Sequence, residues 1–319
     1  MGAPQLSVVV PTHDRPALLV RLLAALESQT VGSGSFETLV VDDGGEQPVG
    51  DLTRFRLKLR VLRHDHPRGP AAARNTGWRA AKGGLIAFTD DDCRPSARWL
   101  EGLLEAWGRD EARIVQGRTE PEPHQRSQLH PLSRTMEISG KTGLYETCNI
   151  AYPRSLLERT GGFDERFRRA CGEDVDLGRR ASNAGAEVVF AGEALVYHVV
   201  HQPTLPAMLR HARIWSDAVL SLRRHPELRM MLFANVFWKR THPLFLLAVL
   251  ASALAARRRS GLLAVLGALP YLEHYRRVYG QTGEPLLRAA RRLPEHMLID
   301  AVEVATMVEG TVRHRTLML

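Results

Sequence analysis

The chain has 319 residues, 44% hydrophobic and 24% charged, which is the composition of a globular protein and argues against wholesale disorder. Its three cysteines are well separated along the sequence, which argues against a disulfide framework and favours a reducing compartment. The net charge of +8 belongs to the C-terminal third, because residues 202–319 contain 17 Lys and Arg against 8 Asp and Glu, whereas residues 1–201 contain 26 against 27. This asymmetry suggests an anionic partner for the C-terminal segment or, equally, a solvated arginine-rich helical face.

The N-terminus begins "MGAPQLSVVVPTHD", with a short apolar run and no basic residue before it, so we do not expect a signal peptide. From here the sequence alternates strand and helix patterns. The predicted strands are residues 6–10, 37–45, 57–65 and 85–89. The predicted helices are residues 16–26, which start at a proline, residues 71–84, which close with glycines, and residues 96–107, which start with Ser96 as the cap. This alternation predicts an α/β fold with a doubly wound, mostly parallel sheet.

Polar segments follow three of these strands: "PTHD" after the first, "DDGG" after the second and "TDDD" after the fourth. In doubly wound sheets, ligands bind in a crevice outside the carboxyl ends of the strands. We therefore expect the three segments to open onto one crevice.

Three consecutive aspartates, Asp90, Asp91 and Asp92, follow the apolar strand 85–89. Like charges so close together repel each other, which is unfavourable unless a cation joins them. Carboxylate oxygens suit Mg²⁺ or Mn²⁺, which commonly bind one or two carboxylates together with substrate phosphates. The alternative is that these side chains cap the helix at 96–107.

Two further polar positions belong to the same edge of the predicted sheet. Asp42 is suited to accept a hydrogen bond from a nucleoside, whereas Asp43, directly before glycine, is more suited to the turn. Arg74 lies in the first turns of the helix at 71–84, where it either pairs with a diphosphate or the aspartates, or is an ordinary surface arginine.

A second acidic cluster, Glu173, Asp174 and Asp176, opens a helix that ends near Gly185. Acidic side chains are favoured in a first helical turn, but three exceed what one cap needs. A carboxylate there can serve as a general base. The segment 189–201 follows as a strand that ends at His198, which either joins a metal or phosphates or is an ordinary core or surface histidine.

Beyond residue 202 the pattern is helical, with apolar runs at 243–256 and 261–272 separated by arginines. The longer run would span roughly 21 Å, short of the ~30 Å hydrocarbon core, so neither predicts a transmembrane helix. We expect a helical hairpin at a membrane interface, or one packed on the catalytic domain or on a second subunit. The basic residues that flank the hairpin are Lys239, Arg240, Arg257, Arg258 and Arg259.

Several segments, taken together, resemble the family 2 glycosyltransferases, which are inverting enzymes of GT-A fold. The resemblance covers about residues 5–200 and rests on the order and spacing of its motifs. These are "SVVVPTHDRPALLVRLLAALESQT", "VVDDGG", "GPAAARNTGW", "FTDDDCRP", "CNIAYPR", "GGFDERF" and "GEDVDLGRR".

The resemblance implies a GT-A catalytic domain at 1–201 that binds a nucleotide sugar, followed by a basic α-helical region at 202–319. It implies a hexosyltransferase-type enzyme that uses a nucleoside-diphosphate sugar, with UDP the commonest and dTDP or GDP as alternatives, and Mn²⁺ or Mg²⁺ bound through a DxD motif. Matched position by position, the metal ligands are Asp92 and Asp90. His198 is a further candidate because of its place at the end of the strand, not because of the resemblance. The donor-contacting positions are Pro11, Thr12, Asp42, Arg74, Asp90 and Asp91. The catalytic base is Asp174, and Glu173 completes the "ED" pair.

The chain departs from the processive synthases of this family, since "LGRRASNAG" contains no Q-x-x-R-W motif and long transmembrane helices are not predicted. A single sugar addition is therefore expected, onto a carbohydrate, lipid-linked or small-molecule acceptor. A sugar nucleotidyltransferase and a catalytically silent binding protein are the alternatives, and a nucleic-acid partner is not expected. We expect a cytoplasmic protein, peripheral at the inner face of the membrane through 239–277 or self-associating as a homo-oligomer.

Overall fold

The structure is a computed structural model that describes residues 4–283 and 285–319, and the chain divides into two compact units. Unit 1 contains the residues up to Gln128 together with Thr135–His201. Unit 2 contains Leu129–Arg134 together with Gln202–Leu319. The short segment 129–134, which we had expected in the first domain, therefore belongs to the second unit.

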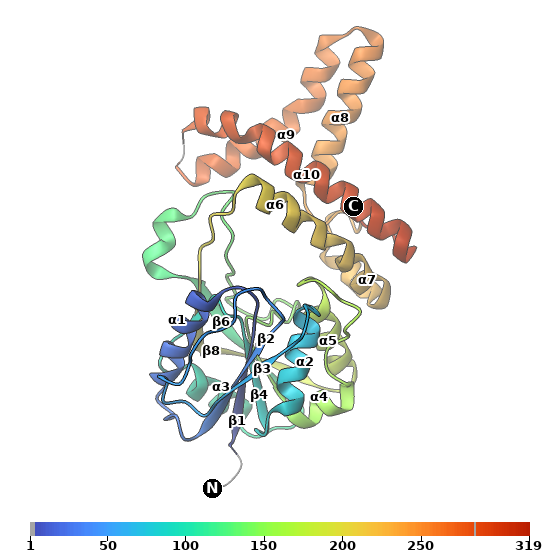
Figure 1. Cartoon of the computed structure of the whole chain (residues 1–319). Helices are drawn as coiled ribbons and strands as arrows, with labels where there is room; N and C mark the ends of the chain where they lie inside the picture. Colours follow the sequence, from blue (N-terminus) through green and yellow to red (C-terminus); the bar gives the residue numbers. More distant parts are fainter. Residues whose placement is uncertain (1–3, 284) are drawn as a thin grey trace. The chain divides into compact units, whose positions relative to one another are not determined.

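Unit 1 is built on a mixed sheet with the strand order β3-β2-β1-β4-β7-β6-β8-β5. The strands β1 to β4 pair in parallel, β6 pairs in parallel with β8, and β7 runs antiparallel between β4 and β6 (Figure 1). The strand bounds are β1 Leu6–Thr12, β2 Phe36–Asp42, β3 Leu59–Arg63, β4 Leu85–Thr89, β5 Cys93–Pro95, β6 Arg113–Pro121, β7 Asn149–Pro153 and β8 Glu187–His198.

Helices cover both faces of this sheet, because successive side chains of a strand point to opposite faces. Val8 and Val10 of β1 pack in one core with α1 and α3, whereas Val9 packs in a second core with α2, α4 and α5. Both faces are therefore buried, which explains the continuous apolar runs of the central strands. The helix bounds are α1 Pro16–Glu27, α2 Pro70–Ala80, α3 Trp99–Trp107, α4 Arg154–Thr160 and α5 Glu173–Asn183.

The predicted elements differ from the observed ones at their ends and in the middle of the sheet. The helix expected at 96–107 begins at Trp99, and Ser96 is not its N-cap; the Ser96 carbonyl accepts a hydrogen bond from the Trp99 amide. The helix expected to reach residue 84 ends at Ala80, since the Gly83 amide instead donates to Ser7 of β1. The strands β5, β6 and β7, which take part in the antiparallel pairing, had not been predicted.

The carboxyl ends of the parallel strands meet at one edge of the sheet. Thr12, at the end of β1, is the register partner of Asp42 at the end of β2. Asp90, Asp91 and Asp92 follow β4, which pairs with β1 on its other side. The sheet topology therefore brings the three polar segments to the same edge, as expected.

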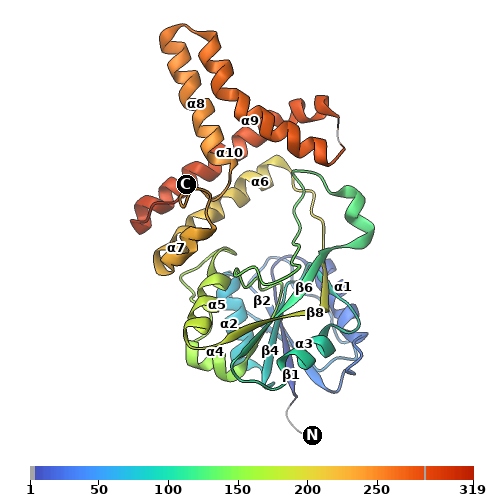
Figure 2. The same ribbon diagram turned by 180° about the vertical axis from the view of Figure 1, so that it is seen from behind.

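Unit 2 is helical, and its core is formed by tyrosines of α9 with Phe245 of α8 and Val304 of α10. The helix α8 runs antiparallel beside α9, and their connecting turn lies at the end of the pair away from α10 (Figures 1 and 2). Among the described residues, no helix is both long and apolar enough to cross a membrane. The helix bounds are α6 Leu205–Ala212, α7 Ser216–Arg224, α8 Thr241–Arg258, α9 Gly261–Gln281 and α10 Leu286–His314, with short 3-10 turns at Arg213–Trp215 and Pro226–Met231. A further 3-10 turn, Pro123–Gln128, belongs to unit 1.

Candidate functional site

The three consecutive aspartates after β4 have three different environments. Asp90 is partly exposed and accepts a hydrogen bond from Arg74 at 2.8 Å. Asp91 is buried and accepts hydrogen bonds from Thr12 Oγ1 at 2.7 Å and from Arg15 at 3.2 Å. Burial raises the pKa of the Asp91 carboxyl to about 6, a shift that the Arg15 guanidinium opposes and the charge of Asp92 reinforces. Asp91 is thus held to the first strand, whereas its neighbours point to other partners.

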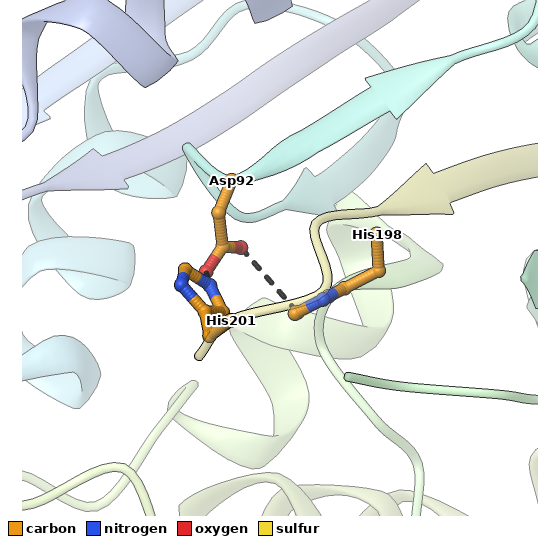
Figure 3. A group of neighbouring side chains, drawn as sticks. All are labelled: Asp92, His198 and His201. Atoms are coloured by element: carbon orange, nitrogen blue, oxygen red, sulfur yellow. Dashed lines mark hydrogen bonds and ion pairs between the residues drawn. The ribbon is translucent and has the colours of Figure 1, made fainter. Parts of the chain in front are cut away.

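The third aspartate, Asp92, lies between two histidines that follow each other closely in the chain (Figure 3). His201 Nε2 lies 2.9 Å from one carboxylate oxygen, and His198 Nε2 lies 3.4 Å from the other. Burial favours the neutral acid, but the hydrogen bond from His201 and the charges of His198 and Arg15 outweigh it, so that the pKa of Asp92 lies well below its usual value. The three side chains can each offer one ligand atom, and these atoms lie within 4.8 Å of one another.

The buried guanidinium of Arg74 joins the two acidic clusters. It donates to Asp90 Oδ1 at 2.8 Å and to Glu173 Oε1 at 2.9 Å, although Glu173 lies 99 residues away in the chain. Burial lowers the pKa of Arg74, but the charges of Asp90 and Glu173 more than reverse this, so the group stays charged. Arg74 therefore brings the start of α5 to the same edge of the sheet as the aspartate triplet.

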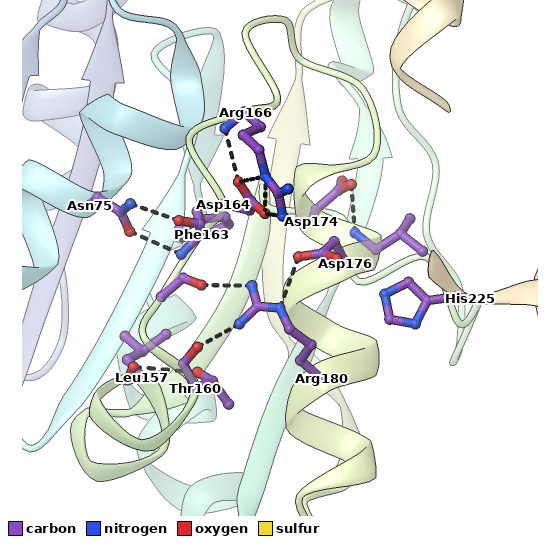
Figure 4. A network of polar contacts seen from close by, with 12 residues as sticks. Asn75, Leu157, Thr160, Phe163, Asp164, Arg166, Asp174, Asp176, Arg180 and His225 are labelled. Atoms are coloured by element: carbon purple, nitrogen blue, oxygen red, sulfur yellow. Dashed lines mark hydrogen bonds and ion pairs between the residues drawn. The ribbon is translucent and has the colours of Figure 1, made fainter. Parts of the chain in front are cut away.

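The acids at the start of α5 have different roles in the structure (Figure 4). Glu173 is paired with Arg74. Asp176 accepts a hydrogen bond from Arg180 at 2.9 Å, which Figure 4 shows. Arg180 also donates to the carbonyl oxygens of Thr160 and Gly162, which fixes the helix to the preceding loop.

Asp174, between these two acids, is half-buried, and its Oδ1 accepts a hydrogen bond from the Val175 amide at 2.8 Å. Burial and the neighbouring charge of Glu173 raise the pKa of the Asp174 carboxyl well above its usual value. A carboxylate with a raised pKa is a stronger base than an ordinary aspartate.

The two aspartates at the end of β2 have different partners. Asp43 accepts hydrogen bonds from the backbone amides of Arg68 and Gly69, so it holds the loop that leads into α2. Asp42 is buried and accepts from Arg63 at the end of β3. Pro11 precedes Thr12 inside β1, opposite Val41 of β2, so both residues lie at the edge where the aspartates converge.

Two residues of this site had not been predicted. Arg15 bridges Asp91 and Asp92 with one guanidinium nitrogen, at 3.2 and 3.1 Å. His201 lies three residues after His198 and just beyond the end of β8. The repeated histidine in "YHVVH" was the available signal, but the partner of each histidine depends on a strand that lies far away in the sequence.

Relatives found by sequence are glycosyltransferases. The chain is 28% identical over 277 residues to validoxylamine A glucosyltransferase of Streptomyces hygroscopicus subsp. limoneus, a match that covers 75% of this chain and 60% of the relative. It is 30% identical over 236 residues to pre-mycofactocin glycosyltransferase of Mycobacterium tuberculosis, covering 69% of this chain and 48% of the relative. The chain thus matches only about half to two thirds of the length of these relatives.

Similar solved structures extend the comparison to the fold. The mannosyltransferase PcManGT from Pyrobaculum calidifontis, solved with GDP-Man and Mn²⁺, is similar with a TM-score of 0.59 at 19% identity, covering 97% of this chain and 88% of that one. Residues 1–349 of S. aureus TarS, solved with UDP-GlcNAc, give a TM-score of 0.54 at 16% identity, covering 98% and 92%. These similarities show a GT-A fold. The family model for glycosyl transferase family 2 matches residues 7–170, and the chain therefore belongs to this family.

Proposed function

We propose that the protein transfers a single sugar from a nucleoside-diphosphate sugar to an acceptor hydroxyl, with inversion at the anomeric carbon. The observation that carries this proposal is the Arg74 bridge, because it joins the aspartate triplet and the "ED" pair at one edge of the sheet. Transfer requires a donor site and a base beside each other, and the two clusters supply residues of suitable chemistry for both.

Asp92, His198 and His201 would hold a divalent cation in this proposal. The carboxylate of Asp92 is a ligand that suits Mn²⁺, and neutral imidazoles are common ligands of divalent metals. Asp92 Oδ1 is buried and forms no hydrogen bond among the described residues, so it has lone pairs available for a cation. A metal ion bound there would neutralise charge on the diphosphate.

The remaining residues of the triplet would serve the donor. Both donor binding and metal binding were expected of Asp90 from the sequence. Because Asp90 is paired with Arg74, we prefer the role in donor binding. Asp91 supports the site through Thr12 and Arg15, and Asp42, with Pro11 and Thr12 beside it, lies at the nucleoside-contacting positions. Arg15 is half-exposed and forms ion pairs with both Asp91 and Asp92.

The base is Asp174 in this proposal. Glu173 is committed to Arg74 and Asp176 to Arg180, which leaves the half-buried carboxylate of Asp174 as the acid of this cluster best suited to accept the proton of the acceptor hydroxyl. The oxygen that loses this proton would form the new glycosidic bond, while the bond from the anomeric carbon to the diphosphate breaks. Attack from the face opposite the diphosphate inverts the anomeric configuration.

We propose the donor and the acceptor as chemical classes and not as single compounds. UDP-sugars are the first choice for the donor, with dTDP- and GDP-sugars as alternatives, and the acceptor is a carbohydrate, a lipid-linked sugar or a small molecule. A single addition is supported by the missing Q-x-x-R-W motif in "LGRRASNAG". For location and partners we propose a cytoplasmic enzyme with a peripheral contact to an anionic membrane through 239–277, and a homo-oligomer as the alternative.

A panel of nucleotide sugars tests the proposal, with thermal shift and release of nucleoside diphosphate measured with and without Mn²⁺. We expect one nucleotide class to raise the melting temperature and to release nucleoside diphosphate when Mn²⁺ is present. Release of pyrophosphate instead would indicate a nucleotidyltransferase. A protein that binds a nucleotide sugar and releases nothing with any acceptor class would indicate a binding protein.

A further inference from the structure

The pair of helices α8 and α9, called here the hairpin, exposes large apolar side chains along both helices. Leu250 and Leu262 are each 67% exposed, a value typical of a polar surface residue. The exposed positions recur every three or four residues, so each helix carries an apolar stripe on its surface. The exposed large apolar residues of α8 are Leu247, Val249, Leu250 and Leu254, and those of α9 are Leu262, Val265, Leu266, Leu269 and Leu272.

The contact between the two helices uses small residues instead. Ala248 and Ala255 of α8 are buried, and Gly267 of α9 packs so closely against Ala251 that a Cβ atom would clash with it. Two helices in water normally bury their leucines against each other and expose their small and polar residues. In the hairpin, small residues lie between the helices and leucines lie on the outer surface. This outer surface is therefore suited to an apolar environment.

The charged residues of the hairpin segment 241–272 are all basic. Residues 241–272 contain no Asp and no Glu, and their basic residues are Arg257, Arg258 and Arg259 at the turn, all of them exposed. In Figures 1 and 2 this turn lies at the end of the hairpin away from α10. Three exposed arginines next to exposed leucines match a surface that is apolar inside and negatively charged outside.

The geometry points to an anionic lipid bilayer as the surface that covers the hairpin. We propose that the hairpin lies in the plane of the bilayer surface, with its leucines at the boundary of the acyl chains and Arg257, Arg258 and Arg259 on lipid phosphates. The apolar run 243–256 spans only roughly 21 Å, which suits a helix that lies in the interface better than one that crosses the ~30 Å core. A second copy of the chain could bury the leucines, but segment 241–272 would offer no acid to the arginines. The inference rests on the peripheral contact proposed for 239–277 and narrows it to these side chains.

Vesicle flotation of the full-length chain tests the inference, with phosphatidylcholine alone and with phosphatidylcholine that contains phosphatidylglycerol. We expect binding to the anionic vesicles that weakens with added salt. The triple variant Leu250→Gln, Leu262→Gln, Leu266→Gln should abolish binding. The triple variant Arg257→Gln, Arg258→Gln, Arg259→Gln should weaken binding by about five-fold for each arginine replaced, the effect of one basic residue near an anionic leaflet.

The matched control is the double variant Leu287→Gln, Val312→Gln on α10, where the side chains are 65% and 74% exposed but lie outside the hairpin. It should bind anionic vesicles as the unchanged protein does. Circular dichroism verifies that each variant is folded. The inference is overturned if the unchanged protein does not float, if the leucine variant floats equally well, or if light scattering finds an oligomer that the leucine variant converts to a monomer.

Hydrolysis of the nucleotide sugar without vesicles is measured on the same samples. The leucine and arginine variants should keep this activity, because none of the replaced residues belongs to the site in unit 1. A protein that binds vesicles but releases no nucleoside diphosphate would contradict the proposed transfer reaction and leave the membrane contact supported.

Discussion

At the scale of single residues, the acids at the start of α5 differ in whether an arginine is their partner. Glu173 and Asp176 are each paired with a buried or half-buried arginine, whereas Asp174 is half-buried beside them. Replacing a paired acid leaves an arginine without its partner, which destabilises the fold. Replacing Asp174 removes the proposed proton acceptor.

We predict that Asp174→Asn lowers kcat by about 100-fold or more, as loss of a general base does, and leaves donor affinity unchanged. Release of nucleoside diphosphate in the presence of acceptor measures kcat, and calorimetric titration measures donor affinity. The control is Asp176→Asn, which should instead lower the melting temperature because Arg180 loses its ion pair. Full turnover by Asp174→Asn would rule out this residue as the base.

The environment of Asp92 leads to a second prediction at this scale. Asp92→Asn and His201→Ala should each weaken Mn²⁺ binding by about 10-fold or more, because each removes one of the proposed ligands. Calorimetry or the electron paramagnetic resonance signal of free Mn²⁺ measures this without an assay of activity. Asp51→Asn, which changes an exposed carboxylate elsewhere, is the matched control. Equal Mn²⁺ affinity in all three variants would contradict the proposed metal site.

At the scale of the elements, α5 is held in place by a glycine that faces an aromatic ring. A Cβ atom on Gly178 would clash with the ring of Tyr145, and the Tyr145 hydroxyl also forms a hydrogen bond with Ser182 of α5 at 2.9 Å. The close approach of this helix to the loop before β7 positions the "ED" pair at its first turn. The glycine in "EDVDLGRR" is therefore explained by packing.

We predict that Gly178→Ala destabilises unit 1 by about 1–3 kcal/mol, the usual effect of overpacking, although alanine is the better helix former. The control is Gly280→Ala in α9, where a Cβ atom would meet no described atom within 4 Å. That variant should be neutral or stabilising by up to about 1 kcal/mol. Urea unfolding of both variants measures the difference, and an unchanged midpoint for Gly178→Ala would contradict the packing argument.

At the scale of the whole molecule, the two units have different kinds of interior. Unit 1 has two apolar cores on either side of its sheet, whereas unit 2 buries ionisable and hydroxyl groups among its helices. Asp300 accepts hydrogen bonds from Thr241 and Tyr271, and Glu303 accepts two from Lys239 at 2.7 Å. Four of these residues, Lys239, Thr241, Asp300 and Glu303, line a pocket of about 380 Å³ within unit 2. Because Asp300 and Glu303 are buried and ionisable, the stability of unit 2 should depend on pH.

His296 lines the same pocket, and its titration leads to a prediction about the stability of unit 2. Burial, together with the charges of Arg292 and Lys239, lowers the pKa of this imidazole to about 4, whereas the unfolded chain titrates near 6.5. Above pH about 6.5 the imidazole is neutral in both states. As the pH falls toward 4 the unfolded chain gains a proton that the folded unit does not accept, so the free energy of unfolding decreases.

We expect His296→Gln to remove part of this decrease between pH 6.5 and 4, on the order of 2 kcal/mol, because glutamine does not titrate. Thermal unfolding at a series of pH values measures it. His66→Gln, at an exposed position, should keep the pH dependence of the unchanged protein. An unaltered pH profile for His296→Gln would show that other groups are responsible.

The sequence by itself determined the local features of this protein. Strand and helix periodicity identified β1 to β4 and the helices between them, and the polar residues after those strands located the edge of the sheet where the site lies. These features could be predicted because the burial of both sheet faces and the first turn of a helix leave their patterns in neighbouring residues. The family motifs placed the acids of both clusters in the same unit.

The tertiary structure decided which partner each of these groups has. Arg74 joins acids that lie 16 and 99 residues away, and His201 reaches an aspartate 109 residues earlier, so no local pattern indicates these pairs. The antiparallel strand β7 was likewise not predicted. The sequence left open whether the hairpin faces a membrane interface or packs on protein, and its exposed leucines appear only in the structure. An apolar stripe specifies that a surface avoids water, but which surface covers it depends on packing between segments far apart in the chain or on a partner outside it.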